Sequence, residues 1–99
     1  MRYLFLSLRI VDRFVPLMEH LNVSEVARSK SGFLTAYRKV KGRGEHLSDY
    51  WLTQRDGFIA RHMAQVRQKN EPLFYDDGLP TRRHLALIAW AYSPQPGKL

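Results

Sequence analysis

A cluster of basic side chains in the first half of the chain is the strongest indication of chemistry in the sequence. Lysine and arginine at this density favour contact with nucleic-acid phosphates, and the hydroxyl groups of Ser31 and Thr35 can approach base edges. The alternative is an ordinary solvated surface, since many helix faces carry comparable charge. The six cations fall within sixteen residues that hold no acidic side chain: Arg28, Lys30, Arg38, Lys39, Lys41 and Arg43.

A second basic group, Thr81, Arg82 and Arg83, lies at the predicted start of a helix. Free backbone N–H groups at such a position attract anions, so a phosphate could bind there. The alternative is that both arginines pair with carboxylates across the preceding turn, and the short separation in sequence favours this pairing. The candidate carboxylates are Glu71, Asp76 and Asp77.

The sequence holds few features of a metal-binding site. No two histidines stand three to five residues apart, so no helical face presents a chelating pair, and the chain has no cysteine. The run Asp76-Asp77-Gly78 lacks the alternating ligands of a calcium loop and is interpreted as a turn. We therefore expect neither a metal ion nor a cofactor.

Catalysis also finds little support. No glycine-rich phosphate loop, nucleophile elbow or His-Glu zinc motif is present. A small hydrolase would require a pocket that brings His62 or His84 to a carboxylate. We expect a protein without enzymatic activity.

The helix predicted over residues 80–92 should organise the fold. Pro80 suits its first turn, Thr81 is a candidate cap, and Pro94 prevents the helix from continuing. Apolar residues lie on nearly every side of this helix, so it must be buried. A longer helix that follows a Ser48 cap and runs to about Gln68 should lie across it.

The basic cluster falls on a predicted helix, turn and second helix. Asn22 is a suitable cap for a short helix over residues 23–28, residues 29–32 break it, and another helix covers residues 33–40. This order is typical of the helix-turn-helix of DNA-binding proteins, so we expect DNA ahead of RNA. The match is shifted by one residue, because the glycine usual in the turn is Gly32 here and not residue 31.

The length of 99 residues predicts a single domain over residues 1–99. Residues 1–21 are expected to form an N-terminal extension that packs on the domain or between chains. Their spacing fits either a strand or a helix at the start, and a helix around residues 12–21. The apolar run is too short for a bilayer and lacks a cleavage site, so we expect a cytoplasmic protein with no membrane partner. Residues 95–99 are expected to be a disordered tail.

Three runs of sequence, residues 27–37, 55–65 and 80–94, resemble a family of short uncharacterised proteins from phage and marine microbial sequences. The resemblance covers roughly the last three quarters of the chain. It leaves out the segment before about Asn22, which is expected to be an extension particular to this chain or a misassigned start. The family has no assigned activity, so the resemblance implies no role for any residue.

Together these patterns predict a mostly all-α fold, a compact bundle of about four helices with a helix-turn-helix. The formal net charge of +7 adds to the expectation of a small regulatory protein that binds nucleic acid. The alternative is a protein-interaction module or homodimer with little salt-sensitive affinity for DNA. Such a dimer would bury apolar side chains between chains: Leu4, Phe5, Leu6 or Trp90.

Overall fold

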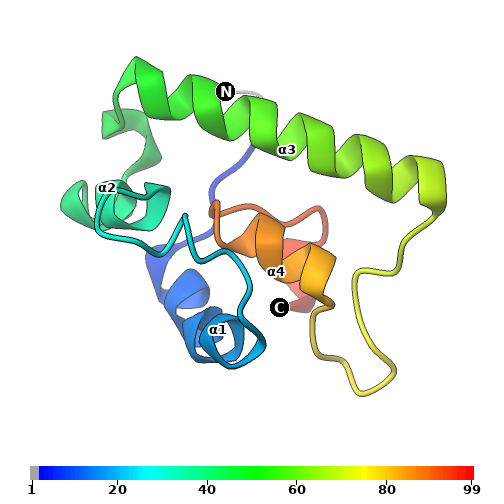
Figure 1. Cartoon of the computed structure of the whole chain (residues 1–99). Coiled ribbons are helices and arrows are strands. Elements are labelled where there is room, and N and C mark those ends of the chain that lie inside the picture. The colour runs from blue at the N-terminus through cyan, green and yellow to red at the C-terminus, as the bar shows by residue number, and fades with distance from the viewer. Residues whose placement is uncertain (1–2) are drawn as a thin grey trace.

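Four α-helices and two short 3-10 helices make up the computed structural model, which describes residues 3–99 (Figure 1). The predicted all-α bundle is confirmed. Within the described residues, β-type pairing is limited to one isolated bridge between Phe74 and Pro80. The helices are α1 (Leu8–Leu21), α2 (Phe33–Lys39), η1 (Gly44–His46), α3 (Asp49–Lys69), α4 (Arg82–Ile88) and η2 (Pro96–Lys98).

Helix α4 lies at the centre of the bundle, as its apolar surface predicts. Both α1 and α3 pack against it, and Figure 1 shows it between α3 above and α1 below. Leu85, Leu87 and Ile88 are fully buried. The core forms around these side chains because a helix that is apolar on most sides must be covered on most sides.

Helix α4 is shorter than predicted. Thr81 is its N-cap as expected, and its Oγ1 accepts a hydrogen bond from the His84 N–H at 3.3 Å. The helix ends at Ile88 instead of Tyr92, because the chain closes in a Schellman motif in which the Tyr92 N–H bonds back to the Leu87 carbonyl at 3.2 Å. Ala91 adopts a left-handed conformation with φ of 57°, which closes the turn.

Helix α3 agrees with the prediction to within one residue at its end. Ser48 is the N-cap and accepts a hydrogen bond from the Trp51 N–H at 3.4 Å, and the helix stops at Asn70 with φ of 50°. Ile59 and Val66 of the predicted apolar stripe are buried against the core side. This long helix therefore covers the bundle along one side (Figure 1).

The N-terminal segment contributes side chains to the hydrophobic core of the domain. Residues 8–21 form α1, capped by Ser7, and Val11 and Met18 are fully buried. Residues 3–7 form neither a strand nor a helix, and the Leu6 N–H donates to the Ala91 carbonyl at 2.7 Å. The expectations for residues 1 and 2 lie outside the described residues.

The predicted helix over residues 23–28 is wrong, and with it the helix-turn-helix. Asn22, with φ of 55°, is the C-cap of α1, and turns follow up to α2. A right-handed helix cannot run through this segment, because the backbone of Ser24 is left-handed with φ of 59°. The second predicted helix is confirmed as α2.

The loop before α4 and the C-terminal tail are ordered by local bonds. The predicted Asp-Gly turn forms: Gly78 has φ of 87°, and the Tyr75 N–H donates to the Leu79 carbonyl at 2.8 Å. The tail, expected to be disordered, forms η2 and places Leu99 against the core.

Over residues 3–99 no helix combines the length and the apolar character that a membrane crossing requires.

Candidate functional site

The basic cluster borders a cavity of about 210 Å³ between α2 and the start of α3. We call this cavity the Lys39 hollow. Its position follows from the fold, because the turn before α2 and the first turn of α3 meet beside the basic face of α2. It is lined by Lys30, Ser31, Gly32, Thr35, Ala36, Lys39 and Trp51.

Two of the six clustered cations stabilise the fold. The Nε of Arg28 donates to the Val23 carbonyl at 3.0 Å. The Nη2 of Arg38 forms an ion pair with Asp12 Oδ1 at 2.6 Å, which joins α2 to α1. These two arginines are therefore weaker candidates for phosphate contact than the sequence alone suggests.

The other four cations are exposed and form no ion pair within residues 3–99. Lys30 and Lys39 line the hollow, and Lys41 and Arg43 follow directly after α2. Four cations without carboxylate partners leave this side of the molecule positively charged.

The two hydroxyl groups assigned to base contacts have different environments. Ser31 is exposed and lines the hollow, whereas the Thr35 hydroxyl donates to the Ser29 carbonyl at 2.8 Å. Thr35 therefore fixes the turn before α2, and its oxygen keeps only acceptor capacity.

Aromatic rings lie beside the Lys39 hollow. Trp51 lines the hollow, and the neighbouring ring of Tyr50 is 63% exposed. The two ring centroids lie 5.1 Å apart with an interplanar angle of 78°. One signal in the sequence could have indicated these rings beside the hollow: two adjacent aromatic residues in the first turn of a helix, next to a basic loop.

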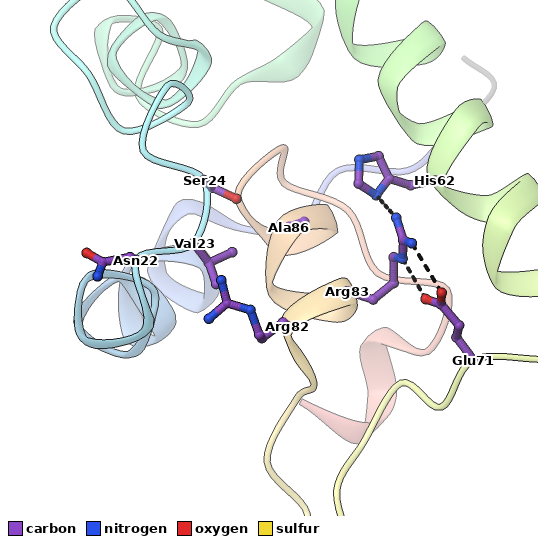
Figure 2. Close-up of a pocket in the computed structure, with 8 residues that line it drawn as sticks. All are labelled: Asn22, Val23, Ser24, His62, Glu71, Arg82, Arg83 and Ala86. Atoms are coloured by element: carbon purple, nitrogen blue, oxygen red, sulfur yellow. Dashed lines mark hydrogen bonds and ion pairs between the residues drawn. The ribbon is translucent and has the colours of Figure 1, made fainter.

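A second cavity, of about 390 Å³, contains the arginines at the start of α4 (Figure 2). We call it the Arg82 pocket. The segment of residues 22–32 borders both cavities, since its first residues line this pocket and its last residues line the Lys39 hollow. The pocket is lined by Asn22, Val23, Ser24, His62, Glu71, Arg82, Arg83 and Ala86.

Arg83 pairs with Glu71, as the ionic alternative predicts. Its Nε lies 2.6 Å from Glu71 Oε2, its Nη2 donates to Gln65 Oε1 at 2.7 Å, and its Nη1 lies 2.8 Å from His62 Nδ1. This hydrogen bonding lowers the pKa of Glu71 below its usual range. The guanidinium of Arg83 is thus largely occupied by protein groups (Figure 2).

Arg82 has a different role from its neighbour. Its Nη1 donates to the Leu21 carbonyl at 2.5 Å and so satisfies the end of α1, but it forms no ion pair within residues 3–99. The predicted pairing of Arg82 with an acidic side chain is therefore wrong. Thr81 does not line the pocket, because its buried hydroxyl donates to the Pro72 carbonyl at 3.0 Å.

Neither candidate histidine is oriented by a carboxylate. His84 is buried, with its Nδ1 2.8 Å from the Leu73 carbonyl and its Nε2 2.7 Å from Ser93 Oγ. Glu71 shares the Arg82 pocket with His62, but Arg83 bonds to both and lies between them (Figure 2). Burial and the charge of Arg83 lower the pKa of His62, which keeps the ring neutral.

No group of His, Asp or Glu side chains within residues 3–99 is arranged to hold a metal ion. Comparisons of the chain with protein-family models, with curated proteins and with solved structures found no match.

Proposed function

We propose that this protein binds single-stranded nucleic acid through the Lys39 hollow and the basic residues that follow α2. The observation that supports the proposal most directly is the lining of the hollow, where Lys30 and Lys39 stand beside the Trp51 ring. Cations along a groove contact backbone phosphates, and exposed rings stack on bases. The exposed ring of Tyr50 extends the same surface.

A single strand fits this surface better than a duplex. Residues 23–28 do not form the first helix that a helix-turn-helix needs to position a recognition helix in the major groove. Rings stack only on bases that are unpaired or splayed out, whereas the phosphates of either form attract lysine. A bound strand would therefore make the expected phosphate contacts, and its bases would stack on the rings instead of presenting their edges in a groove.

The first experiment measures fluorescence anisotropy of a labelled mixed-sequence strand, alone and in duplex form, at several salt concentrations. Contacts from Lys30, Lys39, Lys41 and Arg43 predict a log–log salt slope of about −3, since each neutralised phosphate of a single strand contributes about −0.7. Affinity for the duplex should be weaker. Failure of the strand to bind at low salt would reject the proposal and leave self-association as the function to test.

Lys41→Gly offers a test in which folding cannot explain the loss of binding. Helix α2 ends in a Schellman motif, with the Gly42 N–H bonded to the Tyr37 carbonyl at 3.0 Å, and Lys41 occupies its left-handed position with φ of 56°. Glycine prefers that conformation, so the variant should gain up to about 1 kcal/mol of stability. Its salt slope should shrink by about 0.7 as one phosphate contact is lost.

The aromatic contribution is tested by Tyr50→Ala, which should weaken strand binding by about 1–3 kcal/mol if a base stacks on the ring. Tyr75→Ala is the matched control, since Tyr75 is also half-exposed but lies in the loop before α4. Lys98→Gln removes an exposed cation from the tail and controls for net charge. Equal losses in the test and control variants would contradict a localised binding surface.

A further inference from the structure

The Arg82 pocket carries hydrogen-bond donors that the fold leaves unused. The pocket brings together four parts of the chain: the segment after α1, α3, the loop after α3, and α4 (Figure 2). Because Glu71 is bonded to Arg83, the two charges offset each other. Arg82 remains as a cation without an ionic partner among residues 3–99, and only its Nη1 is bonded.

His62 supplies a second donor. The Nη1 of Arg83 can only donate, so the Nδ1 of His62 must accept this bond. A neutral imidazole that accepts at Nδ1 carries its hydrogen at Nε2. The ring stacks on Phe58 at a centroid distance of 4.1 Å, which fixes its plane. No bond from this Nε2 is present within the described residues.

Ser24 supplies a third donor from the opposite wall. Its hydroxyl has no hydrogen-bond partner within residues 3–99, and Figure 2 shows it pointing toward α4. The backbone of Ser24 is left-handed, with φ of 59°, and that of Asn22 has φ of 55°. Val23 and Ala86 add an apolar patch to the same cavity.

We propose that the Arg82 pocket binds a small phosphate ester, with Arg82, His62 Nε2–H and the Ser24 hydroxyl donating to phosphate oxygens. A guanidinium and neutral donors from separate elements suit an anion with several acceptor oxygens. The cavity, at about 390 Å³, exceeds a bare anion and falls within the range of small-molecule sites. The organic part of the ester would lie against Val23 and Ala86. This site is separate from the strand-binding surface and does not depend on it.

The experiment titrates the full chain with AMP, adenosine and inorganic phosphate and follows the amide and histidine ring signals by NMR. We expect AMP to bind more tightly than phosphate, adenosine not to bind, and the His62 Nε2–H signal to shift. Binding of adenosine with the same affinity as AMP, or no binding of AMP and phosphate, would overturn the proposal. A strand with a 5′-phosphate, compared with its 5′-hydroxyl form, distinguishes a strand end from a free nucleotide as the source of the ester.

Ser24→Gly removes the hydroxyl and relieves the left-handed strain, so this variant should fold at least as well as the parent. Its affinity for AMP should fall about three- to tenfold, as for one lost hydrogen bond. Arg82→Gln should lose about tenfold or more, with thermal unfolding checked because Arg82 also bonds to Leu21. Unchanged affinity in both variants would reject the site.

Lys39→Gln is the matched control from the other cavity. It should leave AMP binding unchanged and weaken only strand binding, because Lys39 lines the hollow and not the Arg82 pocket. In the parent chain, failure of strand binding together with intact AMP binding would reject the proposed function alone. The opposite result would reject the phosphate-ester site alone.

Discussion

A single buried arginine ties together parts of the chain that are far apart in sequence. Arg55 is 1% exposed, and its guanidinium lies 3.7 Å from the Phe5 ring centroid. It donates to the carbonyls of Tyr3, Leu4, Trp90 and Ala91 at 2.7 to 3.0 Å. Burial lowers the pKa of Arg55 to about 10, so it remains charged at neutral pH.

Arg55→Met should destabilise the fold severely. The variant leaves one buried and three partly buried carbonyls without donors, and a buried carbonyl without a partner costs about 1–3 kcal/mol, so we expect a total loss of at least about 3 kcal/mol. Urea denaturation followed by circular dichroism measures this change. Arg61→Met, on the exposed side of the same helix, is the control and should change stability by less than about 0.5 kcal/mol. Similar midpoints for the two variants would contradict the structural role of Arg55.

The buried histidine predicts a loss of stability in mild acid. Burial lowers the pKa of His84 in the folded chain below its usual value near 6.5. The unfolded chain then binds the proton first, so stability falls as the pH drops below about 6.5 and levels off below the folded pKa. The loss amounts to about 1.4 kcal/mol for each unit of pKa lowering.

Urea midpoints at pH values between about 7.5 and 5 measure this dependence. His84→Gln removes the titrating group and should reduce the slope, whatever its effect on stability at pH 7.5. His62→Gln should reduce the slope as well, because the pKa of His62 is also lowered. His46→Gln is the control at an exposed position. A slope that is unchanged in His84→Gln would show that other groups cause the acid sensitivity.

At the scale of elements, the turn between α1 and α2 sets the position of the basic side chains. Gly32 is the N-cap of α2, and its N–H donates to the Ser29 carbonyl at 3.0 Å. The turn packs so closely that a Cβ at this position would lie 2.1 Å from the Val26 carbonyl oxygen and 2.5 Å from that of Ala27. These contacts involve backbone atoms, which cannot move aside as a side chain can.

Gly32→Ala should therefore displace the turn and lower the melting temperature clearly, because overpacking of this kind costs about 1–3 kcal/mol or more. The variant should also lose strand affinity, since the turn carries Lys30 and Ser31 into the hollow. Gly97→Ala makes the same chemical change where no atom lies within 4 Å and should melt like the parent. Equal melting of the two variants would show that the turn tolerates a side chain.

At the scale of the whole molecule, the segment before α1 packs against the segment after α4 and against α2. The Leu6 N–H bonds to the Ala91 carbonyl, the Tyr37 hydroxyl donates to the Leu6 carbonyl at 2.7 Å, and the rings of Tyr3 and Tyr92 lie 5.2 Å apart. Of the apolar residues considered for a dimer contact, Leu6 is buried within the chain and Leu4 is 77% exposed. The N-terminal segment thus packs mainly within its own chain and leaves Leu4 exposed.

A truncated chain that begins at Leu8 tests this arrangement. Removal of residues 1–7 deletes the Leu6 bonds and two of the carbonyls that hold Arg55, so we expect loss of the cooperative unfolding transition. Removal of residues 95–99 is the comparison, since only Leu99 of that segment contacts the core, and should leave a cooperative transition. An equally cooperative transition in both truncated chains would show that the core does not require residues 1–7.

Local signals in the sequence determined the helices and several of their ends. Ser48 and Thr81 cap α3 and α4 because side-chain oxygens satisfy the first N–H groups without help from the rest of the fold. The apolar surface of α4 required a central position, which the structure confirms. The pairing of Arg83 with Glu71 also followed from their short separation in sequence.

Only the tertiary structure decided which residues share a cavity and which helices stop early. Ser24 and Ala91 adopt left-handed conformations that interrupt the predicted helices, and Arg55 of α3 bonds to the Ala91 carbonyl in the second of these turns. His62, Ser24 and Arg82 line one cavity because of packing between elements. The same holds for Trp51 and Lys30, which line the other. A periodic pattern shows which face of an element is apolar, but the partners of that face are set by contacts that no local pattern encodes.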